Sequence, residues 1–430
     1  MHGNPSLKKV LKPVHLWALA VGLVISGEYF GWNLGWDVAG TGGFLIATVL
    51  VTIFYVTFIF SFTELTAAIP HAGGPFAYAY KALGPLGGLI AAYATLVEFL
   101  LAPPAVAFAL GSYVHFLAPV LPVLAVAIGS FVVFTIINFL GIKESVVFSL
   151  IVTILAVCEL LLFMGVVAPG FKWENFKQDA MPFGWSGVFA ALPFAIWFYL
   201  AIEGVAMVAE EVKDPQRTIP RGYIYGIVTL VLLAFGVMFF TGGVTNWHTL
   251  ARIDYPLPEA ISAVLGKQNG WTKVFAGIGL FGLVASFHGV IISYSRQLYA
   301  VARDGYLPKI LATVNSKHRT PNAAMVAGGL VGIIALCLFN TGDVITLSAL
   351  GAVVMYIISM ISLFVLRRKQ PHLERPFKVP LYPWFPGIAL ILAIVCLIAI
   401  VWYNLFLSVI FFGALVLLMI LFVVFRRSGS

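Results

Sequence analysis

The stretch ISGEYFG, residues 25–31, lies in the middle of the first long apolar segment of the chain. It places two glycines and a glutamate, Glu28, at a depth where a membrane-spanning helix meets no water. Irregular backbone at that depth is tolerated only where it lines a cavity or is buried in protein. The sequence therefore predicts that the first span is broken near Gly27 and that the break belongs to a binding site.

The stretch WFYLAIEG, residues 197–204, gives the sixth apolar segment a similar interruption. It again combines a glycine with a glutamate at mid-depth, here Glu203. Interrupted spans in corresponding positions of two halves predict an inverted repeat with a central site, and the second break is expected near Ala201. The alternative interpretation is that these glycines only allow neighbouring helices to pack closely.

The composition is that of an integral membrane protein. Hydrophobic residues make up 61% of the 430 positions and charged residues only 10%, which is too little charge to cover a soluble protein of this length. Because a span needs roughly 20 apolar residues, the sequence predicts an all-α protein with about 12 transmembrane helices. These are expected near residues 14–38, 41–69, 86–116, 120–140, 145–168, 187–209, 221–243, 272–302, 321–340, 343–366, 385–403 and 405–425.

The spans are expected to form a single transmembrane domain over residues 1–430. Residues 14–168 would form the first repeat, 187–366 the inverted second repeat, and 385–425 two additional C-terminal spans. Lysine and arginine gather in the loops on the side of the N-terminus, for example at Lys213 and Arg217, which predicts a multi-pass protein of the cytoplasmic membrane with both termini cytoplasmic. This bias explains the net charge of +8 without a nucleic-acid partner.

Titratable residues inside spans are costly and mark functional sites by default. The candidates at mid-depth are Glu28, Glu98, Glu159, Glu203 and His288. A buried carboxyl or a histidine can load and release a proton near neutral pH, so Glu159, Glu203 and His288 are candidates for proton coupling or gating. The alternative for each is a buried structural group that is hydrogen-bonded to its neighbours.

Four stretches resemble sequences of the amino acid–polyamine–organocation (APC) superfamily of transporters. They are PHAGGP at 70–75, NFLGIK at 138–143, EEVKDP at 210–215 and ARDGYLP at 302–308. The resemblance implies a LeuT-type fold, in which two inverted repeats of five helices surround a central site formed by broken helices 1 and 6. It also implies secondary transport by alternating access.

Two further stretches resemble the bacterial ethanolamine permease group within that superfamily. They are HLWALAVGLVISGEYFGWN at 15–33 and EFLLAPPA at 98–105. Most amino acid transporters of the superfamily carry a Gly-Ser-Gly or Gly-Ala-Gly break in span one, whereas this chain has Ser26-Gly27-Glu28. Glu28 would repel a substrate carboxylate in a low dielectric, so the resemblance implies an organic cation without a carboxylate, ethanolamine.

The expected substrate site combines the two breaks with a glutamate of span three. Pro103 and Pro104 lack an N–H and would free backbone carbonyls near Glu98. Trp197 aligns with an aromatic residue that gates the pocket in relatives such as the arginine/agmatine antiporter, although an aromatic residue here can equally be a packing residue. The expected substrate-binding residues are Ser26, Gly27, Glu28, Tyr29, Glu98, Trp197, Phe198, Tyr199, Ala201 and Glu203.

Several other functions remain open at this stage. A permease for amino acids, polyamines or choline-like cations belongs to the same class of protein. A membrane-embedded enzyme is disfavoured because the sequence contains no HExxH, no nucleophile elbow and no metal-ligand spacing, so neither a cofactor nor a metal is expected. The expected partners are the substrate cation, membrane lipid and a coupling proton. A channel is disfavoured because two broken spans in inverted register favour alternating access.

Overall fold

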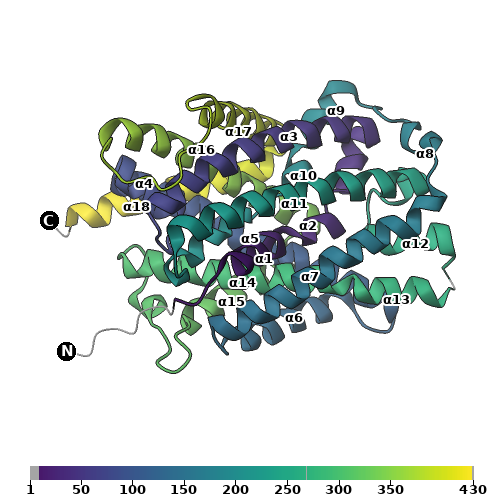
Figure 1. The fold of residues 1–430 in the computed structure, drawn as a ribbon, viewed down its shortest axis with the longest axis horizontal. Helices are drawn as coiled ribbons and strands as arrows, with labels where there is room; N and C mark the ends of the chain where they lie inside the picture. Colours follow the sequence, from purple (N-terminus) through teal and green to yellow (C-terminus); the bar gives the residue numbers. More distant parts are fainter. Residues whose placement is uncertain (1–8, 268, 429–430) are drawn as a thin grey trace.

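The computed structural model describes residues 9–267 and 269–428, and the side chains of 142–145 and 425–428 lie outside that description. The described chain is helical throughout, with most helices running along one bundle axis (Figure 1). The helices of the first half are α1 Pro13–Val24, α2 Ser26–Tyr29, α3 Leu34–Ala68, α4 Pro75–Leu83, α5 Pro85–Leu117, α6 Val123–Asn138, α7 Ile142–Val167 and α8 Trp173–Lys177.

The remaining helices follow in the same bundle. They are α9 Gly184–Ala190, α10 Leu192–Trp197, the 3-10 helix η2 Ile202–Glu211, α11 Pro215–Val244, α12 Pro256–Leu265, α13 Gly270–Ile278, α14 Leu280–Arg303, α15 Asn322–Leu338, α16 Thr341–Lys369, α17 Trp384–Tyr403 and α18 Leu405–Ser428. Short 3-10 turns add η1 Ala168–Gly170, η3 Trp247–Thr249 and η4 Lys309–Ala312. Both ends of the chain lie at the same end of the bundle (Figure 1).

Nine helical segments in the described part of the chain are long and apolar enough to cross a membrane. Three other expected spans coincide with shorter apolar helices, namely α1, α6 and α15. The expected boundary between the first two spans, near residue 40, falls inside the helix α3. There Gly40 has a φ of +69°, so the helix is kinked at the one residue type that adopts this conformation without strain.

The first and sixth expected spans are both interrupted near the predicted positions. The first is divided at Ile25, between α1 and α2, where the backbone stays in the right-handed helical region. It leaves the helix after Tyr29, at the extended residue Phe30 and at Gly31, which has a φ of +86°. The sixth stops at Trp197 and restarts after Ala201, a non-glycine residue with a φ of +76°. Such a left-handed residue is sterically costly, so the surrounding packing must hold it in place.

Two features of the helices were not expected from the sequence. The segment after the second break is a 3-10 helix of 10 residues, η2, which is longer than this tight helix usually extends. The eighth expected span is divided at Gly279 into α13 and α14. Both features lie in the half of the chain that was expected to form the second repeat.

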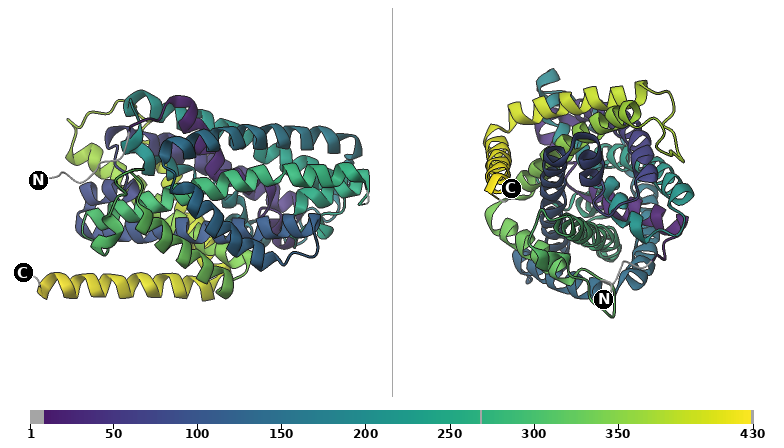
Figure 2. Two further views of the ribbon diagram at one scale, coloured as in Figure 1. Left: turned by 90° about the horizontal axis from the view of Figure 1, so that it is seen from below. Right: turned by 90° about the vertical axis from the view of Figure 1, so that its left-hand side faces the viewer.

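The last two helices pack on the outside of the bundle. Figure 2 shows α17 and α18 at its periphery, with α18 running alongside the other helices rather than between them. In the apolar 18-residue stretch of α18, only 22% of the residues are buried inside the protein. The corresponding share for the central segment Leu192–Glu211 is 94%. The core that positions the central site is therefore made by the helices before α17.

Candidate substrate site at the two helix breaks

The two breaks touch each other in the middle of the bundle. A Cβ at Gly27 would overlap the backbone carbonyl of Trp197, so only glycine lets the two chains approach this closely. On the other side of the first break, the Ser286 hydroxyl of α14 donates to the Leu23 carbonyl at 2.6 Å. The hydroxyl of Ser26 donates to Ser286 at 2.7 Å, so α14 supplies the hydrogen bonds that the broken helix lacks.

A small cavity lies where the breaks meet, with a volume of about 10 Å³, just enough for one water molecule. Its lining residues are Leu23, Val24, Ser26, Ala102, Val106, Trp197, Leu200, Ala201, Ser286 and Val290. Three residues predicted to bind substrate, Ser26, Trp197 and Ala201, are therefore brought together at one cavity. Apart from the two serines and the indole of Trp197, the side chains of this lining are apolar.

Glu28 is buried in the short helix α2, at the first break. Both of its carboxyl oxygens lack a hydrogen-bond partner within the described structure, although the side chain has no exposed surface. Its backbone carbonyl accepts a hydrogen bond from the Trp32 indole at 3.2 Å. The Tyr199 hydroxyl, which was expected at the same site, bonds Thr52 at 2.7 Å. Glu28 is thus a buried acidic group with unused acceptor capacity.

Glu98 and Glu203 form a pair of buried carboxyl groups. Glu98 comes from α5 and Glu203 from the start of η2, and both side chains are buried. Neither oxygen of Glu98 nor Oε1 of Glu203 has a hydrogen-bond partner in the described structure. Two ionised carboxylates near each other in a low dielectric repel, which favours one proton shared by the pair. The Tyr356 hydroxyl donates to Glu203 Oε2 at 3.1 Å and bonds the Tyr55 hydroxyl at 2.9 Å.

Glu159 lies in a separate cluster on the other side of the first break. Its carboxyl is a neighbour of Tyr29, whose hydroxyl donates its single proton to the Ala156 carbonyl at 2.9 Å. The backbone carbonyl of Tyr29 in turn accepts from the Tyr113 hydroxyl at 3.1 Å. Tyr29 therefore connects the end of α2 to α7, and it is not among the residues that line the small cavity.

His288 is buried on a different face of α14 from Ser286. Its Nδ1 lies 2.9 Å from the side-chain nitrogen of Asn138, and its ring contacts Phe134 and Phe148 at centroid distances of 6.4 and 5.0 Å. These neighbours belong to α6 and α7. The structure thus brings His288 to the outer helices of the bundle and not to the carboxyl pair.

The aromatic residues that were expected to bind substrate do not all lie at the small cavity. Trp197 lines the cavity and meets Phe30 edge-on at a centroid distance of 5.6 Å. Phe198 instead stacks on Trp32 at 5.5 Å, with an angle of 17° between their planes. The indole nitrogen of Trp197 is buried without a hydrogen-bond acceptor in the described structure. Trp197 is therefore the aromatic residue that a ligand in the cavity would contact first.

Ion pairs connect the helices at the end of the bundle that carries both termini. Arg296 of α14 and Glu211 of η2 form a buried ion pair at 2.9 Å. Arg303 donates to Glu210 at 2.8 Å, and its guanidinium lies 2.9 Å from His71 Nε2. Burial lowers the pKa of His71 below the ordinary value of 6.5, the Glu210 carboxylate opposes this shift, and Arg303 adds to it.

Four uncharged residues make contacts at this site that the sequence did not predict. Ser286 bonds the first break, Tyr356 bonds Glu203, Tyr55 bonds Tyr356, and Tyr113 bonds the end of α2. Each lies inside an apolar span, where a hydroxyl is common in helix packing and carries little signal. A search for hydroxyl residues at mid-depth would have included them among many others.

Comparison with known proteins identifies the family. The family described as "Amino acid permease" matches residues 11–425. An uncharacterized transporter of Rhizobium meliloti is 30% identical over 400 residues, covering 91% of this chain and 85% of the relative. A branched-chain amino acid permease of Bacillus subtilis is 28% identical, covering 94% and 90%. A methylthioribose transporter of Bacillus subtilis is 26% identical, covering 90% and 87%.

These relatives support the expected place in the APC superfamily and a transport function rather than an enzymatic one. They also agree with the many apolar helices of the structure, which indicate a multi-pass membrane protein. A match over residues 11–425 covers nearly all of the described chain. The chain therefore belongs to the amino acid permease family of membrane transporters.

Proposed function

We propose that this protein imports ethanolamine, or a closely similar small organic cation, across the cytoplasmic membrane. The observation that carries the proposal is Glu28, whose two buried carboxyl oxygens have no hydrogen-bond partner in the described structure. An ammonium group supplies three donors and a compensating positive charge, which is what a buried carboxylate needs. The hydroxyl of ethanolamine would add one polar contact, for which Ser26 in the cavity lining is a candidate.

A substrate with its own carboxylate fits this site less well. Glu98 and Glu203 add two more buried acidic side chains near the second break. The buried arginine of α14, Arg296, is already paired with Glu211 at 2.9 Å. A substrate carboxylate would meet uncompensated negative charge in a low dielectric, which favours a cation over a zwitterion.

The proposed architecture is the 12-span, LeuT-type arrangement of two inverted repeats, with both termini in the cytoplasm. Its support is that helix pairs of one half recur in the other. The contact of α1 with α11 corresponds to the contact of α10 with α3. The contact of α5 with α16 likewise corresponds to the contact of α14 with α7. Such pairs are related by a shift of five spans, which is expected of a repeat over 14–168 and 187–366.

For the coupling ion we propose a proton held between Glu98 and Glu203. Glu98 and Glu203 are both buried, so one shared proton would relieve the repulsion between their carboxylates, and Tyr356 donates to the same Glu203 side chain. An arriving substrate cation would compete with that proton for the same negative charge. Binding of the substrate would therefore depend on whether the proton is bound, and binding of the proton would depend on the substrate. Glu159, next to Tyr29, and His288, next to Asn138, are the alternative proton sites.

A second candidate is transport of a small apolar amino acid. The cavity at the breaks is lined mostly by apolar side chains, and two relatives are named branched-chain amino acid permeases. In that case Glu28 would serve as a cap of the short helix α2, where a carboxylate is favourable near the N-terminal amides.

Uptake of radiolabelled ethanolamine into proteoliposomes tests the proposal. The expected result is saturable uptake that excess unlabelled ethanolamine suppresses and that leucine or valine does not. Uptake of labelled leucine without ethanolamine transport would favour the second candidate and refute the first. Uptake should be compared under an imposed proton gradient, an imposed sodium gradient and neither, because strict sodium dependence would contradict proton coupling. Equal uptake in all three would indicate a uniporter driven by the membrane potential.

A further inference from the structure

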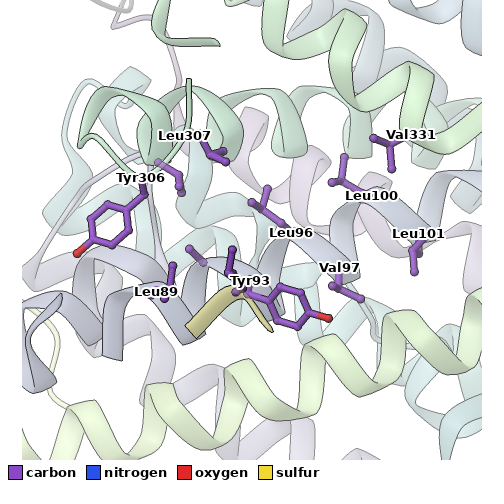
Figure 3. A pocket seen from close by; sticks show the side chains of 12 residues that line it. Leu89, Tyr93, Leu96, Val97, Leu100, Leu101, Tyr306, Leu307 and Val331 are labelled. Carbon is purple, nitrogen blue, oxygen red and sulfur yellow. The ribbon is translucent and has the colours of Figure 1, made fainter. Parts of the chain in front are cut away.

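An apolar groove separates the C-terminal helix α18 from α5. Its volume is about 340 Å³, within the range of small-molecule sites, and apart from Tyr93 and Tyr306 every lining residue is Leu, Val or Ala. Figure 3 shows side chains that project from α5, from the segment after α14 and, at Val331, from α15. Val331 in its wall is 42% exposed, so the groove reaches the surface that faces the membrane.

The hydroxyl protons of the two tyrosines in the groove are already used in hydrogen bonds. The Tyr93 hydroxyl donates to the Phe411 carbonyl at 2.7 Å, and the Tyr306 hydroxyl donates to the Pro85 carbonyl at 3.2 Å. Within the groove, an occupant is therefore held chiefly by apolar contact. This favours an apolar chain over a small polar cation.

Helix α18 is fixed to the bundle at both ends of the groove. The ring of Phe411 contacts Tyr93 at a centroid distance of 5.1 Å, and the ring of Phe422 stacks on Tyr306 at 5.5 Å. The two phenylalanines are 11 residues apart, 422 minus 411, which at about 1.5 Å per residue gives a groove roughly 16 Å long. One leaflet of hydrocarbon is about 15 Å thick, so the groove matches the length of one acyl chain.

Two lysines lie at the Tyr306 end of the groove. Lys309 follows Leu307 of the lining by two residues, and Lys81 follows Tyr80, whose ring contacts Tyr306 at 6.4 Å. Both side chains are exposed, and in the described part of the chain neither takes part in an ion pair. The acidic residue nearest in sequence, Asp304, is already within 3.7 Å of His71 and 3.9 Å of Arg303.

We propose that the groove between α5 and α18 binds one acyl chain of an anionic phospholipid, with its phosphate at Lys81 and Lys309. Basic residues beside an apolar cleft between transmembrane helices are the recognised chemistry for anionic headgroups. The lipid belongs to the leaflet at the end of the bundle that carries both chain termini, where α4 lies (Figure 1). It would bridge α18 to the transport core and fix the position of that outer helix.

The test measures the melting temperature of the purified protein in detergent with added phosphatidylglycerol or phosphatidylcholine of identical acyl chains. For the wild type, we expect phosphatidylglycerol to raise the melting temperature more than phosphatidylcholine does. In the double variant Lys81→Gln/Lys309→Gln, the two lipids should give the same shift. In Leu96→Trp, which fills the groove, the shift with both lipids should be lost.

Matched controls place the same changes elsewhere. Leu232→Trp adds the same bulk on α11, where the side chain is 69% exposed, and Lys172→Gln/Lys273→Gln removes two exposed lysines at the opposite end of the bundle. Both controls should respond to lipid as the wild type does. Native mass spectrometry gives a second measurement, in which wild type retains one more phosphatidylglycerol than either groove variant. If Leu96→Trp fails to fold, the count of bound phosphatidylglycerol on the wild type and on the double lysine variant decides the test.

Three results would overturn the proposal. The first is an equal response of wild type to both lipids, and the second is a lysine variant that still distinguishes them. The third is a wild-type dimer that Leu96→Trp converts to a monomer, because the groove would then hold a helix of a second copy.

Discussion

The hydroxyl of Tyr356 donates a 3.1 Å hydrogen bond to the carboxyl group of Glu203, and this bond joins α16 to the broken sixth span. Because the hydroxyl proton of Tyr356 is used on Glu203, the 2.9 Å contact with Tyr55 must have Tyr55 as donor. A chain of two hydroxyls thus runs from α3 to the buried carboxyl pair. The position of each hydroxyl in this chain predicts how much it contributes to the stability of the protein.

Tyr356→Phe should destabilise the protein more than Tyr55→Phe. The first change leaves the buried Glu203 carboxyl without its hydroxyl donor, at a cost of about 1–3 kcal/mol, whereas the second removes only a bond between two neutral hydroxyls. Denaturation monitored by tryptophan fluorescence in detergent gives both values. The opposite order, or equal effects, would show that the carboxyl pair does not depend on Tyr356.

Glu28→Gln should weaken ethanolamine binding by about tenfold or more, because it removes a charge-assisted hydrogen bond that contributes roughly 1.5–3 kcal/mol. The variant keeps the shape of the side chain. Calorimetry on the purified protein measures the change directly. Glu374→Gln is the matched control, since it removes one negative charge from an exposed loop position and should leave affinity unchanged. Unchanged affinity in Glu28→Gln would refute its role as a substrate ligand.

Gly27→Ala should disrupt the contact between the two breaks. The added Cβ overlaps the Trp197 carbonyl, which is backbone and has little freedom to move, so a loss of about 1–3 kcal/mol is expected together with a loss of uptake. The control is Gly165→Ala in α7, where a Cβ meets nothing within 4 Å and helix propensity favours alanine. If both variants melt and transport alike, the breaks do not touch as described.

Arg296→Met should be among the most destabilising single changes in the protein. It leaves the fully buried Glu211 carboxylate without its cation, and the loss of one partner of a buried ion pair typically costs about 3–5 kcal/mol. The double variant Arg296→Met/Glu211→Leu should recover much of that loss, because it removes the unpaired charge as well. Thermal melting of both variants tests this, and additive effects of the two changes would contradict it.

Stability should fall on mild acidification through His71. Its pKa in the folded protein is lowered, chiefly by burial, so the unfolded chain takes up a proton first as the pH drops below about 6.5. The contribution of neutral His71 is complete above that pH and is lost as the pH falls toward the folded-state value. His71→Asn keeps an acceptor for the amide of Gly73, which bonds Nδ1 at 2.9 Å.

The measurement for His71 is the melting temperature of both proteins between pH 5 and 8. The two curves should run parallel above about pH 7 and separate below about pH 6.5, with the wild type losing more. A wild type that gains stability relative to the variant on acidification would mean that the carboxylates of Glu210 and Asp304 outweigh burial.

Much of the fold could be predicted from the sequence. The apolar segments correspond to helices because hydrophobic length is a property of the chain alone. The breaks near Gly27 and Ala201 were also predictable, since glycine and an acidic residue at mid-depth conflict with a continuous helix. The 3-10 form of η2 was not, because its geometry depends on how Glu203 and its neighbours pack.

The sequence alone determined which segments cross the membrane, where two of them are interrupted and which side chains are costly to bury. The tertiary structure decided which of those side chains meet: Glu98 with Glu203, Glu159 with Tyr29, and His288 with Asn138. The physical reason is that helices in a membrane are apolar on every face. Hydrophobicity therefore fixes the length of each helix but not its rotation, which depends on close packing and on hydrogen bonds such as the one from Ser26 to Ser286.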